Sequence, residues 1–236
     1  MKIGIIGAME EEILMLKETI INPVIETYSG FEVVSGQLGD HQVALVLSGI
    51  GKVNATLSVM ILKEKYQIDL IINTGSAGAV DPAIKVGDVV IAHSLSHHDV
   101  DVTGFGYAYG QMAGMPERYL PDSELLRIAQ MVCRTFEIEP IIGLVVSGDQ
   151  FINSKEQINK IRTNFPTARA VDMESAAIAQ ASYVLDIPYV IIRSISDNAN
   201  DEASVDFDTF IELASRVSAS MVIEFVKQVP FDPYAK

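Results

Sequence analysis

The sequence predicts a single α/β domain over residues 1–236, with a mixed, mostly parallel central sheet flanked by helices. Apolar runs of strand length alternate with segments of helical periodicity, an order typical of parallel sheets covered by helices. A length of 236 residues suits one large α/β domain with a sizeable core. No repeat, low-complexity stretch or polar linker divides the sequence, so we expect one folding unit.

Six apolar runs rich in β-branched residues have the length and flanking residues of buried strands. In chain order they are 2–7, 43–47, 69–73, 88–92, 141–146 and 188–195. Six further segments space their apolar residues as amphipathic helices do. These are 9–20, 52–65, 122–137, 154–164, 174–185 and 207–228.

Two segments interrupt this alternation. Alternating residues at 24–47, with Gly39-Asp40 as a turn, predict an antiparallel hairpin, which would make the sheet mixed. The stretch 101–121, rich in glycine, proline and aromatic residues, is predicted to be one long loop. Loops of that length are uncommon unless they have a function.

Composition excludes several classes of partner. A net charge of −14 opposes binding to nucleic acids and anionic membranes, and the longest apolar runs are far shorter than a membrane span. Cys133 is the only cysteine, which rules out an intramolecular disulfide and favours a reducing cytoplasm. Lys2 leads straight into a strand rather than a signal peptide. We therefore expect a cytoplasmic protein that binds a small molecule or another protein.

Five predicted strands end in polar or glycine-rich sequence. They are GAMEEE at 7–12, SGIGKVN at 48–54, NTGSAGAV at 73–80, SGDQFIN at 147–153 and RSISDNAND at 193–201. A sixth segment, AVDMES at 170–175, joins a short strand to an alanine-rich helix. The carboxyl ends of parallel strands meet at one edge of a sheet, where α/β proteins bind ligands. We therefore expect these segments to converge on one site.

Each segment also has a plainer interpretation. Glycine-rich strand ends are mostly turns, and acidic residues in a first helical turn usually complement the helix dipole. The helix-dipole explanation is sufficient for Glu10, Glu11 and Glu174 individually. Arg193 and Asp197 could simply be an ion pair with no further role. The expected convergence at one edge favours a ligand site over unrelated turns.

Other motifs are weak. GIIGAM at 4–9 lacks the dinucleotide-binding spacing, and the sequence has no Walker lysine pattern. His97, Asp99 and Asp101 would share a face if extended, but polar residues on a loop are common, so no metal is predicted. No histidine follows a predicted strand in the way a serine hydrolase needs, and Cys133 lies among apolar neighbours typical of a core.

The motifs IGIIGAMEEE, SGIGKVNA, IINTGSAGA, VSGDQFI, VDMES and RSISD, in this order and spacing, resemble those of the bacterial 5′-methylthioadenosine/S-adenosylhomocysteine nucleosidases. The resemblance extends from residue 1 to about residue 226. It implies a nucleoside phosphorylase-like fold and hydrolysis of the N-glycosidic bond, which releases adenine and a thioribose sugar. It also implies no cofactor and a homodimer in which loop 101–115 of each subunit completes the partner's pocket.

The resemblance further implies a role for individual residues. Glu12 resembles the group that activates the attacking water, and Asp197 resembles the acid that protonates N7 of adenine. The remaining positions fall into four groups: a ribose site of Ser76, Gly78, Met173, Glu174 and Arg193; an adenine site of Phe151, Ile152 and Ser196; alkylthio-pocket walls of Met9, Ile50 and Phe207; and a closing loop from the partner with Val102, Phe105 and Tyr107.

Two positions depart from the family pattern. Asp172 stands where a glutamate is more frequent, which would loosen a contact behind the site. Ala113 stands where a proline is often found, which weakens the expectation for that contact of the partner loop.

The residue types suit this chemistry. Cleavage builds positive charge on the sugar and negative charge on the leaving base, so a carboxylate near the ribose and a proton donor at N7 both help. An unperturbed aspartic acid is protonated only about once in a thousand at pH 7. Asp197 must therefore be buried, paired with a like charge, or protonated as the substrate binds.

Two other functions stay open on the sequence. A nucleoside phosphorylase would use phosphate, but Glu10 to Glu12 supply negative charge and no cation where phosphate would bind, which favours water. A non-catalytic nucleoside-binding module would not need both Glu12 and Asp197. The sequence also leaves open the relative rates on methylthioadenosine, S-adenosylhomocysteine and 5′-deoxyadenosine, and related 6-amino-6-deoxyfutalosine chemistry.

Overall fold

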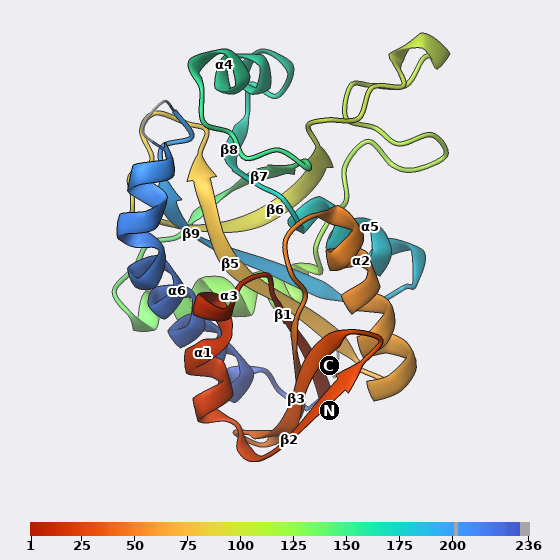
Figure 1. Ribbon diagram of the computed structural model, residues 1–236, viewed down its shortest axis with the longest axis vertical. Coiled ribbons are helices and arrows are strands. Elements are labelled where there is room, and N and C mark those ends of the chain that lie inside the picture. The colour runs from red at the N-terminus through yellow and green to blue at the C-terminus, as the bar shows by residue number, and fades with distance from the viewer. Residues whose placement is uncertain (201–202, 232–236) are drawn as a thin grey trace.

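A nine-stranded mixed sheet with helices on both faces is formed by residues 1–200 and 203–231, the part of the chain that the computed structural model describes (Figure 1). The strands are β1 (Lys2–Gly7), β2 (Ile21–Tyr28), β3 (Phe31–Leu38), β4 (His41–Leu47), β5 (Leu70–Ala79), β6 (Val89–His97), β7 (Ile141–Ser147), β8 (Ala168–Asp172) and β9 (Tyr189–Asp197). The helices are α1 (Glu10–Thr19), α2 (Lys52–Ile61), α3 (Ser123–Thr135), α4 (Lys155–Asn164), α5 (Ser175–Val184) and α6 (Ala203–Gln228).

The sheet combines an open part with a closed part. β1 lies between β4 and β5 and runs parallel to both. β5 pairs with β8 and also, in parallel, with β9, and the strand order continues from β8 through β7 and β6 to β9. These five strands therefore close into a ring. The predicted mixed sheet flanked by helices is confirmed.

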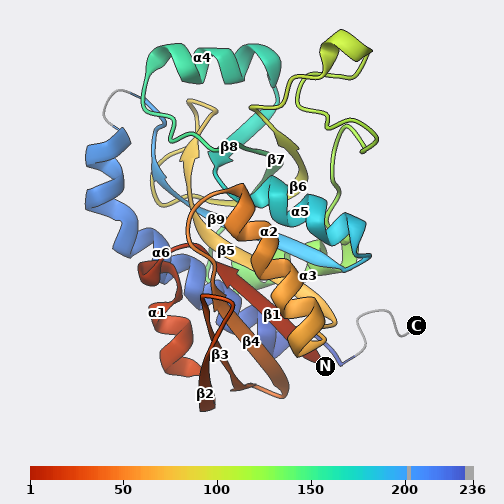
Figure 2. The same ribbon diagram turned by 45° about the vertical axis from the view of Figure 1, so that its right-hand side comes forward.

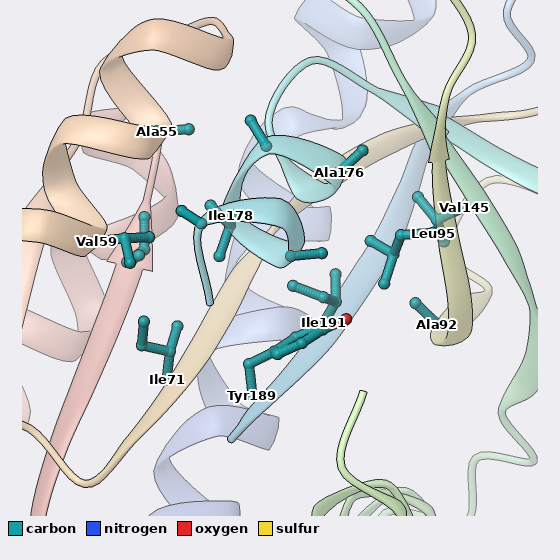
Figure 3. Packing of buried hydrophobic residues seen from close by; sticks show 14 of the residues in the cluster. Ala55, Val59, Ile71, Ala92, Leu95, Val145, Ala176, Ile178, Tyr189 and Ile191 are labelled. Atoms are coloured by element: carbon teal, nitrogen blue, oxygen red, sulfur yellow. The ribbon is translucent and has the colours of Figure 1, made fainter. Parts of the chain in front are cut away.

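Helices pack on both faces of the sheet through separate apolar clusters. α2 and α5 lie side by side on one face, and α1, α3 and α6 lie on the other (Figures 1 and 2). Figure 3 shows Val59 of α2 and Ile178 of α5 above Ile71 of β5 and Ile191 of β9. Full burial of each such side chain contributes about 1.5–3 kcal/mol. This packing holds the strand ends that carry the polar motifs.

The predicted hairpin is present, and one strand was missed. β3 and β4 pair in antiparallel orientation around the Gly39–Asp40 turn, where Gly39 has a φ of +58° that glycine adopts without strain. β2 adds a further antiparallel strand at the outer edge of the sheet. Most of β2 is exposed and it contains Pro23, as an edge strand tolerates. It therefore has no buried face, and its place in the sheet is set by its pairing with β3.

Three strands extend two or more residues past their predicted ends. β5, β6 and β9 were expected to end at residues 73, 92 and 195, and they end at Ala79, His97 and Asp197. β5 and β9 pair with each other from Ile71 and Tyr189 to Gly78 and Asp197. Small and polar residues that resemble turns are thus held in strands by backbone pairing.

The helices differ from the prediction at their ends. α6 begins at Ala203, before the predicted start, and α2 passes at Leu62–Tyr66 into a π-helical turn. The predicted loop 101–121 contains a short 3-10 turn at Thr103–Phe105 and returns to the sheet where Tyr119 bridges Leu95. Among the described helices, none is long and apolar enough to cross a membrane.

Candidate active site

A cavity of about 480 Å³ opens where β1, β5, β8 and β9 end. Segments from across the chain line it, as predicted from the polar strand ends. The lining residues are Ala8, Met9, Glu12, Ile50, Ser76, Ala77, Gly78, Phe151, Val171, Asp172, Met173, Glu174, Ser196, Asp197 and Phe207. Within the described chain, the lining contains four carboxyl groups and neither Lys nor Arg.

Glu12 is a buried carboxylate held by four donors. Its Oε2 accepts hydrogen bonds from the backbone N–H groups of Ala8 (2.9 Å) and Met9 (3.2 Å). Its Oε1 accepts from the backbone N–H of Ser76 (2.9 Å) and from the Ser76 hydroxyl (3.0 Å). A Cβ on Gly75 would lie 2.8 Å from Oε1, so only glycine leaves room for the carboxylate here. The first turn of α1 and strand β5 together fix this side chain.

Only one of the three consecutive glutamates lines the cavity. Glu10 instead pairs with Lys17 at 2.7 Å on the surface of α1. Glu11 is exposed and borders a separate groove between α1 and α6. The expected triple negative charge at this strand end is therefore wrong, because successive helical residues point about 100° apart. The helix-dipole interpretation fits Glu10 and Glu11.

Asp197 closes β9 and is almost entirely buried, with 3% of its surface exposed. Its Oδ1 accepts from the backbone N–H of Ala199 (2.8 Å), and its Oδ2 accepts from the Ser196 hydroxyl (2.9 Å). A Cβ on Gly78 would lie 2.8 Å from Oδ1. Burial raises the pKa of Asp197 above its usual value, although these two hydrogen bonds oppose the shift. The carboxyl group therefore retains a proton at higher pH than an exposed aspartate.

Glu174 faces the cavity from the start of α5. Its Oε1 accepts from the backbone N–H of Gly51 at 2.8 Å, and Gly51 has a φ of +99° that favours glycine. Burial, with a smaller contribution from the charge of Asp172, raises the pKa of Glu174 to about 8. Its carboxyl group therefore retains a proton at higher pH than an exposed glutamate, and in its protonated form it can donate one hydrogen bond as well as accept.

Arg193 pairs with Asp172 and not with Asp197. Its Nε donates to Asp172 at 2.7 Å, and both side chains are 2% exposed. Its Nη2 donates to Asn73 Oδ1 at 2.5 Å. The suggested Arg193–Asp197 ion pair is therefore wrong, and Arg193 lies behind the cavity wall rather than in it.

Asp172, the departure from the family pattern, is the centre of this buried network. It also accepts from the hydroxyls of Ser147 and Ser175. Burial alone would raise the pKa of Asp172, but the Arg193 guanidinium and the two hydroxyls hold it below its usual value. Sequence reasoning assigned no role to Asn73, Ser147 and Ser175, although all three lie in the polar segments predicted to surround the site. Although aspartate is shorter than the glutamate more frequent at this position, both carboxylate oxygens of Asp172 accept hydrogen bonds from the two serine hydroxyls and the Arg193 guanidinium.

Apolar side chains form the outer walls. Phe151 and Phe207 meet nearly edge to face, with ring centroids 5.9 Å apart, and Phe151 is 40% exposed. Ile152 is buried and lines a small adjoining hollow of about 30 Å³ beside Asp197. Met9, Ile50 and Met173 line the main cavity. The residues predicted for adenine and the alkylthio group therefore lie together.

The predicted closing-loop residues do not line this chain's own cavity. Phe105 is 87% exposed, and Val102 and Tyr107 are half-buried. Ala113 is exposed near Tyr107, whose hydroxyl accepts from the neighbouring Gly114 N–H. Tyr109 of the same loop packs on Phe165.

The polar residues of the segment 96–102, SHHDVDV, each have a different partner. His97 Nε2 hydrogen-bonds Gln180 at 2.8 Å, Asp99 pairs with Lys52, and Asp101 accepts from Thr103. Within the described residues, no group of three or more His, Cys, Asp or Glu side chains is arranged to hold a metal ion.

Known proteins resemble this chain over nearly its whole length. Residues 2–227 match the model of the phosphorylase superfamily. A 5′-methylthioadenosine/S-adenosylhomocysteine nucleosidase of Shewanella piezotolerans is 48% identical over 230 residues, covering 97% of this chain and 100% of that protein.

Solved structures of nucleosidases also resemble this chain over nearly its whole length. The S-adenosylhomocysteine nucleosidase from Streptococcus pyogenes, in complex with 5-methylthiotubericidin, has a TM-score of 0.95 and 42% identity, covering 98% of both chains. A 5′-methylthioadenosine/S-adenosylhomocysteine nucleosidase from S. pneumoniae, with a transition-state inhibitor, has a TM-score of 0.94 and 46% identity, covering 98% of this chain and 100% of that one.

Proposed function

The chain belongs to the phosphorylase superfamily, as one of its 5′-methylthioadenosine/S-adenosylhomocysteine nucleosidases, and we propose that Glu12 and Asp197 carry out its chemistry. The reaction is hydrolysis of the N-glycosidic bond of the two nucleosides, which releases adenine and a thioribose sugar. The observation that carries the assignment of roles is the pair of buried carboxyl groups facing one cavity from β9 and α1. By the same chemistry, 5′-deoxyadenosine is a further substrate.

Glu12 activates the attacking water in this proposal. Three of its four donors are backbone N–H groups, which cannot turn away, and the fourth is the Ser76 hydroxyl, which can rotate. Rotation of that hydroxyl leaves a lone pair on Oε1 for a water molecule. The carboxylate then accepts the proton of the water as the water attacks the sugar carbon.

Asp197 supplies the proton for the leaving base. Adenine stacked on Phe151 would present N7 to the Asp197 carboxyl, and the backbone of Ile152 and the Ser196 side chain would contact its edge. The raised pKa of Asp197 supports this role, because a general acid must still hold its proton near neutral pH. Proton transfer to N7 removes the negative charge that develops as the bond breaks.

The remaining contacts bind the sugar and its 5′ substituent. Glu174 and Met173 contact the ribose beside Ser76 and Gly78, and Arg193 positions this region through Asp172. In its protonated form, which the raised pKa favours, Glu174 can donate to one sugar hydroxyl and accept from the other. Met9, Ile50 and Phe207 form an apolar pocket that suits an alkylthio group.

Adenine release should not require phosphate. Two unit charges about 4 Å apart interact by about 4 kcal/mol at an effective dielectric constant near 20, so a phosphate beside Glu12 would bind roughly a thousandfold more weakly. The cavity lining described has no Lys or Arg to offset this. Incubation of the enzyme with methylthioadenosine in phosphate-free buffer should release adenine and free methylthioribose.

The same assay tests the competing function. A strict dependence on phosphate, with the sugar 1-phosphate as product, would identify a phosphorylase and contradict the role of Glu12. Parallel incubations with S-adenosylhomocysteine, 5′-deoxyadenosine and 6-amino-6-deoxyfutalosine rank the substrates. A chain that binds adenine and cleaves none of them would be a binding module.

We also propose a homodimer in which loop 101–115 completes the partner's cavity with Val102, Phe105 and Tyr107. The loop projects from the same side of the molecule as α5, which packs against α2 (Figures 1 and 2). These two helices expose apolar side chains, among them Val53 (70%) on α2 and Val184 (60%) on α5. Exposed apolar helices on the same side of the molecule as an exposed aromatic loop are typical of a subunit interface.

Static light scattering should give twice the chain mass of 25.7 kDa. Val53→Lys places a charge in the proposed interface, so we expect monomers with at least about tenfold lower activity, since each cavity loses the partner's aromatic side chains. Leu14→Lys, at an exposed apolar residue of α1 on the opposite face, is the matched control and should remain dimeric. A fully active monomer would contradict the proposal.

In this proposal residues 1–236 act as one nucleosidase domain in the cytoplasm. The cytoplasmic assignment is supported by Cys133, a buried free thiol.

A further inference from the structure

Lys52, Asp99 and Asp149 form a closed ring of hydrogen bonds beside the cavity. The Lys52 ammonium donates to both oxygens of Asp99, at 2.7 and 2.8 Å. The backbone N–H of Asp149 donates to Asp99 Oδ2 at 3.0 Å, and the backbone N–H of Lys52 donates to Asp149 Oδ1 at 2.8 Å. We call these three residues the Lys52 triad.

The triad joins segments that are distant in sequence. Lys52 begins α2, Asp99 follows β6, and Asp149 lies in the loop after β7. The segments are also packed tightly: a Cβ on Gly148 would lie 2.4 Å from the His98 ring, and one on Gly51 would lie 3.2 Å from Asp149 Oδ1. Because Gly51 and Gly148 have no side chain, the three segments can pack close together around the triad.

The ion pair within the triad is largely shielded from water. The side chains of Lys52 and Asp99 are 20% and 17% exposed. Partial burial would raise the pKa of Asp99, but the Lys52 ammonium and the Asp149 N–H hold it below its usual value. Asp99 is therefore charged at neutral pH, and loss of its charge would leave the Lys52 ammonium without its partner.

Two of the three segments carry residues assigned above to the substrate. Gly51, adjacent to Lys52, donates its N–H to Glu174, which lines the cavity. Phe151, the proposed adenine platform, is two residues after Asp149. None of the triad side chains lines the cavity itself.

We propose that the Lys52 triad positions Phe151 and Glu174 for the nucleoside, and so controls substrate binding rather than bond cleavage. This inference rests on the proposed function for its substrate. The triad residues are positioning residues, because they act through the Phe151 loop and the Gly51–Glu174 hydrogen bond. An ion pair that only stabilised the fold would change the melting temperature and leave KM unaltered.

The test compares Asp99→Asn with the wild-type enzyme. We expect KM for methylthioadenosine and Kd for adenine, the latter by calorimetry, to rise about tenfold, equivalent to about 1.4 kcal/mol, with kcat within about twofold. Lys52→Arg retains a cation for Asp99 and should keep both constants near wild type. Glu124→Gln, which removes the exposed Arg127 pair on α3, is the matched control and should change neither.

Several results would overturn the proposal. Unchanged KM and Kd in Asp99→Asn would do so, as would a lower kcat at constant KM. If Asp99→Asn does not fold, the double variant Lys52→Met/Asp99→Asn takes its place, because it leaves no unpaired charge. The same rise in KM and Kd is expected for it. Should the wild-type enzyme release no adenine, the proposed function fails, and the adenine Kd of the variants still decides the role of the triad.

Discussion

Replacement of Glu12 by glutamine is expected to lower turnover on methylthioadenosine by about 10²–10⁴-fold, the usual contribution of a general acid or base. The amide has nearly the shape of the carboxylate, but its nitrogen cannot accept a proton from water. Adenine binding should remain close to wild type, because Glu12 does not contact the base in the proposed mechanism.

The same change should also destabilise the fold. Glu12 accepts backbone N–H groups on both oxygens, so the amide nitrogen of glutamine would face at least one N–H donor. An unsatisfied buried donor costs roughly 1–3 kcal/mol. The melting temperature should therefore fall, and activity must be measured well below it.

Glu11→Gln is the matched control, since Glu11 precedes Glu12 in the first turn of α1 and is exposed. It should leave turnover, stability and adenine binding unchanged. Turnover of folded Glu12→Gln within a few-fold of wild type would remove Glu12 from the mechanism.

Asp197→Asn is expected to lower turnover by about 10²–10⁴-fold without disturbing the fold. Asparagine can keep the Ala199 N–H bond through its oxygen and donate from its nitrogen to the Ser196 hydroxyl, so both local contacts have a replacement. The lost group is the acidic proton for N7. Asp208→Asn, an exposed position on α6, is the control and should behave as wild type.

The pH profile distinguishes a lost proton donor from a distorted site. Burial raises the pKa of Asp197, so its donor form is present below that raised pKa and disappears as the pH rises through it. If Asp197 is the acid, wild-type kcat should fall on the alkaline side, and the residual kcat of Asp197→Asn should lack that fall. An alkaline limb retained in a folded Asp197→Asn variant would assign the titration to another group.

The sequence by itself determined the fold class, the order of most elements and the family. Local patterns were enough to predict the elements, because the spacing of apolar residues and the residues that flank them indicate which face of one helix or strand is buried. The six motifs also predicted which segments surround the cavity. Their convergence could be predicted because strand ends in such sheets meet at one edge.

The tertiary structure decided how far β5 and β9 extend. Asn73, Thr74 and Ser76 resemble a turn in sequence, but in the fold each polar side chain finds a partner on another element: Ile6 of β1, Ser218 of α6 and Glu12 of α1. Buried polar groups are tolerated in a strand only when they are hydrogen-bonded. Partners that lie 64 to 144 positions away leave no mark on the local pattern.

The pairing of charges was likewise decided by the tertiary structure. Four residues along a strand span about 13 Å, too far for Arg193 to pair directly with Asp197, whereas β8 brings Asp172 against the Arg193 side chain. Lys52 meets Asp99 and Asp149 in the same way, across 47 and 97 positions. Charge is visible in a sequence, but its partner is set by the distance between elements, which only the folded chain defines.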